Sequence, residues 1–438
     1  MRSTHHYPRT RNHRRTLIAA AFVATALPVL AACAGQSGSP SASVDPETPV
    51  VMVQVPTLDN SYWADVIKGA EAAADALDID VDVQVYGDST DTQLSQVQQA
   101  GSKGVDMALL FAQDQASSPT LIRAATEQGI FVTNIFSNQP WSTPADPEFD
   151  DHYVGYFLPD NVKDSYNMAS SVIDQIGGSG KVIHITGIPG NTTAEERQLG
   201  VQQALDENPG IELVARESGG ENRVATQPVI EDLLTANPDV DAIICHNDDS
   251  AIAVINALKD RGMTDVKVGG IDAIQEFLDD MQNGTNAAAS VAIHGSWFGG
   301  YNVVRLYDAY MGAEYSPAEA MMFQDSLTID TPESAAEYQT VVYKADPLPF
   351  DWAAISRADN PSDWDTQVTL VPIDPEAYWG RIGEEPPAGY SMPEALADDL
   401  ASGAVDNLAS LYLEHSKANP LGPVIALTLS GTTSFGQK

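Results

Sequence analysis

The sequence predicts an α/β protein with two doubly wound parallel-sheet lobes joined by a hinge, followed by an irregular C-terminal extension. Short runs rich in β-branched residues alternate with amphipathic helical patterns. A parallel sheet covered by helices is the arrangement that buries both faces of such strands. The alternation is interrupted once, by the Pro- and acid-rich residues 137–151, and then restarts. Because a mature chain of about 400 residues exceeds one usual hydrophobic core, two lobes are expected.

The first half of the pattern opens with the strand Val50–Val55 and a helix over residues 62–77. Apolar residues recur in this helix at three- and four-residue steps, which places them on one face. They are Trp63, Val66, Ile67, Ala70, Ala74 and Leu77. Further strands are predicted over residues 81–86, 107–111 and 130–135, with helices over 91–101 and 118–128. This half, residues 49–150, is predicted to form an N-terminal lobe that also recovers residues 295–314.

After the break, the same alternation predicts a C-terminal lobe over residues 151–294. Its helices are expected over residues 160–176, 193–207, 225–236 and 250–259, and its strands over 181–186, 211–216, 242–246 and 266–271. Beyond Gly312 the periodicity weakens. Leu327–Ile329 fits a strand, residues 332–343 and 394–415 fit helices, and residues 345–390 are dense in Pro, Asp and Trp. Residues 315–438 are therefore predicted to be an appended region that wraps the lobes.

The N-terminal residues have the pattern of an export signal. A head with five arginines precedes an apolar stretch over residues 17–30, which is too short to span a bilayer comfortably, and small residues then lead to Cys33. This pattern predicts a lipoprotein signal over residues 1–32, whose cleavage makes Cys33 the acylated N-terminus. An ordinary secretory signal with an incidental Cys33 is the alternative, and the Arg14-Arg15 pair leaves the general and twin-arginine routes open. Residues 33–48, rich in Ser, Gly and Pro, are expected to be a flexible tether.

Charge excludes several classes of partner. The chain has 22 basic and 61 acidic side chains, and removal of the five head arginines leaves 17 basic against 61 acidic, a net charge of −44. Nucleic acids and anionic lipid surfaces both require positive surface, so neither is an expected partner. The export signal predicts a location outside the cytoplasm, and the acidic charge leaves acyl chains on Cys33 as the expected attachment to the cell membrane.

No motif for cofactor or metal chemistry stands out. The sequence lacks a dinucleotide fingerprint, a phosphate-binding loop and a Gly-x-Ser-x-Gly elbow, and its histidines lack zinc spacing. Asp359, Asp363 and Asp365 offer oxygen ligands for calcium, but their spacing is not that of an EF-hand, and a solvated acidic turn is preferred. Cys245 lies in an apolar run and is expected to be a buried small hydrophobe. We expect no cofactor and no resident metal.

Several motifs, in order between residues 50 and 312, resemble those of type I periplasmic binding proteins, the ribose-binding-protein-like solute receptors. They are DNSYW at 59–63, IKGAEAA at 67–73, GIPGN at 187–191, Arg197 with Gly200, NPDVDA at 237–242, ND at 247–248 and GID at 270–272. The resemblance implies two lobes that close on a ligand. It also implies a monomeric receptor that serves an ATP-driven importer, whose permease and ATPase are separate proteins.

The first candidate site residues follow the ends of predicted strands, where open α/β sheets bind ligands. Tyr62 and Trp63 offer apolar faces to a sugar ring, although both could instead pack in the core. Asn60 either contacts the ligand or caps the following helix. Asn247 and Asp272 match positions at which the family holds sugar hydroxyls, with helix capping as the alternative.

Departures from the family pattern supply further candidates. Phe136 replaces a carboxylate, Glu195 replaces an arginine, and Glu221 stands where ribose receptors offer an aromatic ring. These changes disfavour an anionic ligand. Arg197 either reaches the ligand or pairs with neighbouring acids, and the second interpretation is preferred because surface ion pairs are common.

Three more side chains are expected to replace the missing contacts. They are Gln113, Trp297 and His294, of which His294 could also be a polar cap at the end of a strand.

These observations favour capture of a neutral sugar or polyol without catalysis. A ligand-sensing surface receptor that feeds a signalling protein, such as a histidine kinase, is the alternative with the same fold. A surface glycoside hydrolase with paired carboxylates is the enzymatic alternative.

Overall fold

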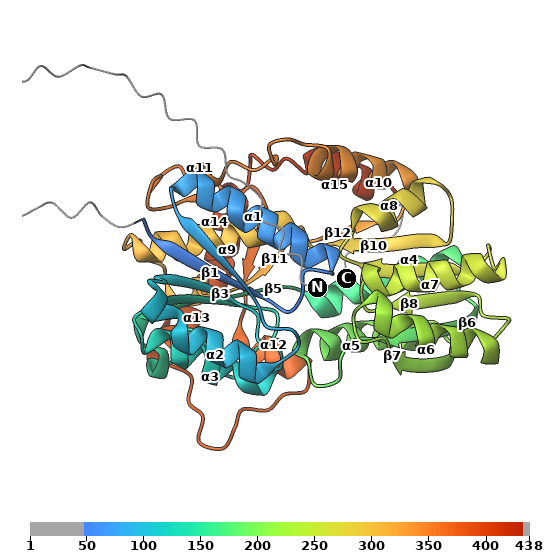
Figure 1. The fold of residues 1–438 in the computed structure, drawn as a ribbon, viewed down its shortest axis with the longest axis horizontal. Helices are drawn as coiled ribbons and strands as arrows, with labels where there is room; N and C mark the ends of the chain where they lie inside the picture. Colours follow the sequence, from blue (N-terminus) through green and yellow to red (C-terminus); the bar gives the residue numbers. More distant parts are fainter. Residues whose placement is uncertain (1–47, 432–438) are drawn as a thin grey trace, which may run out of the picture. The chain divides into compact units, whose positions relative to one another are not determined.

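The computed structural model describes residues 48–431, and the predicted signal, Cys33 and most of the tether lie outside them. Two sheets organise these residues within one compact unit that begins at Thr48. Both sheets are parallel apart from one added strand each, and helices cover them (Figure 1). The predicted two-lobed α/β fold is confirmed.

The first sheet has the strand order β13-β11-β5-β4-β3-β1-β2. Its strands are β1 (Val50–Val55), β2 (Asp80–Val85), β3 (Met107–Leu110), β4 (Phe131–Ile135), β5 (Tyr153–Pro159), β11 (Met321–Gln324) and β13 (Leu370–Pro372). Strand β1, next to the edge strand β2, pairs in parallel with β2 and β3, Val51 lying opposite both Val81 and Met107. The accompanying helices are α1 (Ser61–Leu77), α2 (Thr90–Ala100), α3 (Ser118–Thr126) and α9 (Gly295–Tyr310), with short 3-10 turns η1 (Gly101–Lys103), η2 (Gln115–Ser117), η3 (Pro147–His152) and η4 (Pro317–Glu319).

The second sheet has the strand order β12-β10-β9-β8-β6-β7. Its strands are β6 (Gly180–Thr186), β7 (Ile211–Ser218), β8 (Ala242–Cys245), β9 (Lys267–Ile271), β10 (Ala287–Ala292) and β12 (Leu327–Ile329). The accompanying helices are α4 (Asn161–Gln175), α5 (Thr192–Glu207), α6 (Arg223–Ala236), α7 (Asp248–Arg261) and α8 (Gln275–Gln282). The strand β8 is fully buried, and it includes the free thiol of Cys245, as expected.

The lobe boundary differs from the prediction. Strand β5 pairs with β4 and therefore belongs to the first sheet, although residues 151–159 were assigned to the second lobe. The chain passes from one lobe to the other between β5 and α4, between β10 and α9, between β11 and β12, and again between β12 and β13. These connections form the hinge.

The region after residue 314 is more than an appendage. Strand β11 pairs with β5 of the first sheet and β12 pairs with β10 of the second, so this region completes both sheets. Its helices are α10 (Pro332–Tyr338), α11 (Trp352–Ile355), α12 (Pro375–Arg381), α13 (Glu394–Ala401), α14 (Ala404–Glu414) and α15 (Gly422–Gly431), with a π-helical turn, η5 (Gln339–Tyr343), after α10. The helix predicted over residues 394–415 breaks at Gly403, whose φ of 78° favours glycine. Between residues 48 and 431 the structure contains no helix with the length and apolarity needed to cross a bilayer.

Helices α1 and α9 lie side by side along the first lobe (Figure 1). Glycines permit this close approach. A Cβ atom on Gly69 would lie 1.6 Å from the carbonyl oxygen of Ser296, and one on Gly299 would lie 2.0 Å from that of Val66. Helix α1, which carries candidate site residues in its first turn, is therefore packed tightly against α9, the helix with which the chain returns from the second lobe.

Candidate ligand-binding cleft

A cleft of about 380 Å³ lies where the carboxyl ends of both sheets meet. Loops after β1, β2, β3 and β4 line it from the first lobe, and loops after β6, β7, β8 and β9 line it from the second. Side chains at the ends of parallel strands converge in this way in open α/β folds, where ligands bind. Eight of the predicted site residues line the cleft: Asn60, Tyr62, Trp63, Gln113, Phe136, Arg197, Asn247 and Asp272.

Three predicted site residues lie elsewhere. The exposed Glu195 accepts a hydrogen bond from the backbone N–H of Gly190 at 3.1 Å. The ring Nδ1 of the buried His294 lies 3.1 Å from the hydroxyl of Tyr338. Trp297 is buried in the core, where its Nε1 donates to the carbonyl of Thr366 at 2.8 Å.

Aromatic side chains form one wall of the cleft. Trp63 stacks at a tilt on Phe111, with ring centroids 4.7 Å apart, and meets Tyr62 edge-on at 5.4 Å. Phe136 meets Tyr62, Trp63 and Phe111 edge-on. These arrangements combine core packing with access to the cleft, so the two alternatives for Tyr62 and Trp63 are compatible.

Phe136 has a φ of 59°, a left-handed conformation that is strained for a bulky residue. Its carbonyl accepts a hydrogen bond from the hydroxyl of Tyr156 at 2.7 Å. The hydroxyl of Tyr62 is buried and has no hydrogen-bond partner within residues 48–431. Burial also raises the pKa of Tyr62, so this hydroxyl stays protonated and can donate.

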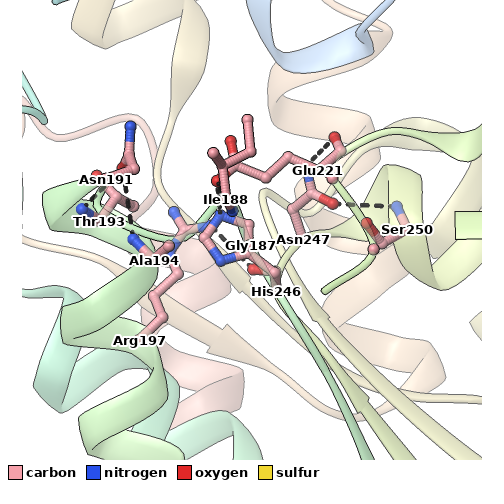
Figure 2. Close-up of polar contacts among 12 residues, drawn as sticks. Gly187, Ile188, Asn191, Thr193, Ala194, Arg197, Glu221, His246, Asn247 and Ser250 are labelled. Carbon is pink, nitrogen blue, oxygen red and sulfur yellow. Dashed lines mark hydrogen bonds and ion pairs between the residues drawn. The ribbon is translucent and has the colours of Figure 1, made fainter. Parts of the chain in front are cut away.

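Asparagine side chains cap the helices that point at the cleft. Asn60 accepts from the N–H of Trp63 at 3.2 Å, and Asn191 accepts from the N–H of Thr193 at 2.9 Å. Asn247 accepts from the N–H of Ser250 at 3.0 Å (Figure 2). Capping is therefore their structural role.

Asn247 also spans two loops of the second lobe. Its amide nitrogen donates to the carbonyl of Glu221 at 3.0 Å, which links the loop after β8 to the loop after β7. Ligand contact by Asn60 and Asn247 remains a prediction. The capping hydrogen bonds fix the positions of these two side chains.

Arg197 is committed to polar partners of the second lobe. Its Nε donates to the side-chain oxygen of Asn161 at 3.2 Å. Its Nη1 donates to the carbonyl of His246 at 2.9 Å, and Figure 2 shows these two residues next to each other. The preferred interpretation, pairing with acids of its own helix, is wrong, because this guanidinium makes no ion pair within the described part of the chain.

Carboxylates line the cleft from the second lobe, whereas the aromatic wall belongs to the first. The side chain of Asp272 is 6% exposed and accepts no hydrogen bond from residues 48–431, and burial raises its pKa well above the ordinary range. Glu221 accepts from the N–H of Ile188 at 3.0 Å, and burial raises its pKa as well. Its carboxylate lies 3.4 Å from Nε2 of His246, but burial and the charge of Arg197 lower the pKa of that histidine and keep it neutral.

The backbone is unusual at both carboxylates. Glu221 has a φ of 61° and Asp272 a φ of 123°, which side-chain-bearing residues rarely adopt. Such conformations concentrate at functional sites.

The structure adds cleft residues that the sequence had not singled out. Phe111, Asp88 and His246 follow β3, β2 and β8, and Arg223 begins α6. A search of the residues at the ends of the predicted strands and just after them could have found the first three. Arg223 reaches the cleft only because of where α6 lies, and no local sequence pattern indicates this position.

The rims of the two lobes contact each other. Asp249 accepts from the N–H of Ser61 across the cleft at 3.1 Å and pairs with Arg223 at 2.6 Å. On another rim, Thr192 donates to the side chain of Gln115 at 3.1 Å. The described conformation is therefore a closed one.

The acidic turn near residue 360 serves local structure. Asp365 accepts from the N–H groups of Gln367 and Ala418 at 2.8 and 3.0 Å. Asp359 accepts from the hydroxyl of Tyr307 at 3.4 Å. No cluster of three metal-binding side chains occurs between residues 48 and 431.

Comparison with known proteins agrees with this geometry. The family model for the periplasmic binding protein domain matches residues 51–314. The ribose import binding protein of Bacillus subtilis is 26% identical over 249 residues, which cover 57% of this chain and 77% of that protein. The D-allose-binding periplasmic protein of Escherichia coli is 29% identical over 278 residues, covering 61% of this chain and 86% of that one.

Solved structures show the same fold. The periplasmic solute binding protein of an ABC transporter from Actinobacillus succinogenes, with bound D-allose, matches with a TM-score of 0.60 and 26% identity over 66% of this chain and 100% of that one. A twin-arginine translocation pathway signal protein from Burkholderia phytofirmans matches with a TM-score of 0.66 and 22% identity over 70% of this chain and 95% of that one. The transporter-linked relatives are binding proteins, which assigns the chain to binding rather than to catalysis. With the family model matched over most of its two lobes, the chain belongs to the periplasmic binding protein domain family.

Proposed function

We propose that this protein is an extracytoplasmic receptor that captures a sugar or polyol without negative charge between its lobes. The observation that carries the proposal is one cleft that is lined by an aromatic wall and the capped Asn60 from the first lobe, and by carboxylates and the capped Asn247 from the second. Aromatic faces suit the C–H side of a sugar ring, while amides and carboxylates suit its hydroxyls. Relatives named for ribose and D-allose support this class of ligand.

The receptor delivers its ligand to a membrane permease driven by a separate ATPase. Ligand binding shifts the lobes towards the closed form, and the permease recognises one face of each lobe in that form. The comparison with an ABC transporter component supports this role. The chain works as a monomer attached to the membrane by acyl chains on Cys33.

A thermal-shift screen over pentoses, hexoses and polyols tests the proposal. A ligand at 100 times its Kd stabilises the native state by about 2.7 kcal/mol, so a true ligand raises the melting temperature clearly. The Asp272→Ala variant should fold and lose the shift. A panel in which no sugar or polyol gives a shift, or turnover of a glycoside by the purified protein, would overturn the proposal.

Attachment to the membrane is tested by cell fractionation. The native protein should sediment with membranes and enter the detergent phase, whereas Cys33→Ala should appear in the aqueous phase. Equal partition of the two proteins would contradict anchoring through Cys33 and would leave ligand capture unaffected.

A further inference from the structure

The cleft offers a ligand more acidic than basic side chains. Arg223 is already paired with Asp249 at 2.6 Å and Glu276 at 2.5 Å. Arg197 is turned to Asn161 and to the carbonyl of His246. Since His246 is neutral, no cationic side chain forms an ion pair with Asp272 or Glu221 within residues 48–431.

We propose that the ligand is a polyhydroxylated amine, an amino sugar or an amino polyol, whose ammonium group binds between Asp272, Glu221 and the aromatic wall. This inference rests on the proposed function and specifies the ligand of the same cleft. It replaces the neutral sugar expected from the sequence with one that carries a positive charge.

The burial of Asp272 is the first argument. Asp272 is 6% exposed and has no hydrogen-bond donor from the described chain, and burial raises its pKa, so its ionised form requires a counter-charge from the ligand. A neutral hydroxyl supplies a hydrogen bond but no charge. An ammonium group supplies both, and charge-assisted hydrogen bonds are about twice as strong as neutral ones.

The hydroxyl of Tyr62 is a second, independent observation. Tyr62 is 5% exposed, lines the cleft, and leaves its hydroxyl without a partner within residues 48–431. A polar atom buried in this way requires a partner from the ligand. The hydroxyl can donate to a ring oxygen or hydroxyl of the same ligand that places its ammonium group at Asp272.

The aromatic wall favours a cation as well as a sugar face. Tyr62, Trp63 and Phe136 line the cleft with their rings edge-on to one another, so their faces point in different directions around it. A cation within about 6 Å of such faces is attracted by the negative face of the ring, most strongly where water is excluded. The same wall therefore binds the hydrocarbon part of an amine and stabilises its charge.

Matched sets of ligands provide the test. Glucosamine, glucose and N-acetylglucosamine form one set, galactosamine, galactose and N-acetylgalactosamine a second, and glucamine with sorbitol a third. Isothermal titration calorimetry of the native protein, at a pH where the amines are protonated, should give at least tenfold tighter binding for the amine of a set than for its neutral members. Acetylation removes the charge and should abolish this preference.

Isosteric variants identify the groups responsible. Asp272→Asn and Glu221→Gln should each reduce the preference for the amine at least fivefold, because they keep the shape and remove the charge. Glu195→Gln is the matched control, since its exposed carboxylate lies outside the cleft. This control should retain the full preference.

The outcomes separate the two proposals. Neutral members that bind as tightly as the amines would overturn the inference and leave the proposed function intact. Failure of every member of the three sets, together with failure of the wider sugar and polyol screen, would overturn both. Because the ligand comparison uses the native protein, it decides the question even where a variant folds poorly.

Discussion

At the scale of single residues, Asn247 both caps a helix and lines the cleft. Its side-chain oxygen caps α7 and its nitrogen connects to the loop of Glu221. The sequence left ligand contact and capping open as alternatives, and the structure shows that capping holds the amide at the cleft. Loss of this side chain therefore affects stability and binding together.

The Asn247→Ala variant should lower the free energy of unfolding by about 1 kcal/mol, the usual loss for an N-cap, and weaken ligand binding. Urea denaturation and ligand titration measure the two effects. Ser89→Ala is the matched control, because Ser89 caps α2 through the N–H of Thr92 and does not line the cleft. It should lose similar stability and bind normally; an Asn247→Ala variant with unchanged binding would remove this residue from the site.

At the scale of elements, the contact between α1 and α9 positions the aromatic wall. The first turn of α1 carries Tyr62 and Trp63, and α9 follows the hinge strand β10. Gly69 and Gly299 bring the two helix backbones together without side chains between them. The sequence predicted both helices, but the close approach depends on tertiary packing and has no local signal.

Gly69→Ala should destabilise the protein by about 1–3 kcal/mol, because its Cβ would overlap the backbone of Ser296. Gly380→Ala is the control, since a Cβ there meets no atom within 4 Å. That change should be neutral or stabilising by up to about 1 kcal/mol, the helix propensity of alanine over glycine. Equal stability of the two variants in chemical denaturation would contradict the packing argument.

Helix α12 connects the C-terminal region to both lobes. Trp379 packs on Trp141 of the first lobe, with ring centroids 5.3 Å apart. The hydroxyl of Tyr378 bonds to Glu196 of α5, and Arg381 pairs with Asp160 at 2.9 Å. The helix therefore stabilises the closed arrangement.

Tyr378→Phe should weaken ligand binding about two- to tenfold, because it removes one hydrogen bond, of about 0.5–1.5 kcal/mol, made by the closed form. The effect should appear mainly as faster ligand dissociation in stopped-flow measurements. Tyr390→Phe is the matched control, since Tyr390 packs on Trp141 and its hydroxyl has no partner within residues 48–431. If both variants release ligand at the native rate, α12 does not restrain opening.

At the scale of the whole molecule, buried carboxyl groups make stability depend on pH. Burial raises the pKa of Asp164, Glu196 and Asp248 to about 7 each. The folded protein thus holds protons that the unfolded chain releases above about pH 4. The free energy of unfolding should therefore fall as pH rises from about 4 to 7 and level off above 7, by up to about 1.4 kcal/mol per pH unit for each group.

Glu196→Gln should make this decline shallower, because the amide keeps the shape of the protonated acid without titrating. Urea denaturation at intervals from pH 4.5 to 7.5 measures the slope. The exposed Glu127, changed to Gln, should keep the native slope. A Glu196→Gln protein with the native slope would show that this carboxyl is ionised in the fold.

The two-lobed fold could be predicted because strands and helices of α/β proteins have strong local patterns. Residues just after strands, such as Asn60 and Asp272, could also be placed at the cleft, because topology brings strand ends together. The residues of β5 were assigned to the wrong lobe, since local periodicity does not show with which sheet a segment pairs after a long irregular break. Trp297 and His294 were misplaced because aromatic and polar residues near a cleft look the same in sequence whether they face it or the core.

The bridge that α12 makes between the lobes has a consequence for the lifetime of the complex. Contacts within the chain already hold the two lobes closed. A small molecule can therefore enter only after the lobes open, and it can leave only when they open again. Such a receptor exchanges its cargo slowly, and protein purified from its native cells should still contain it. Mass spectrometry of the small molecules released on denaturation would then identify the natural guest directly.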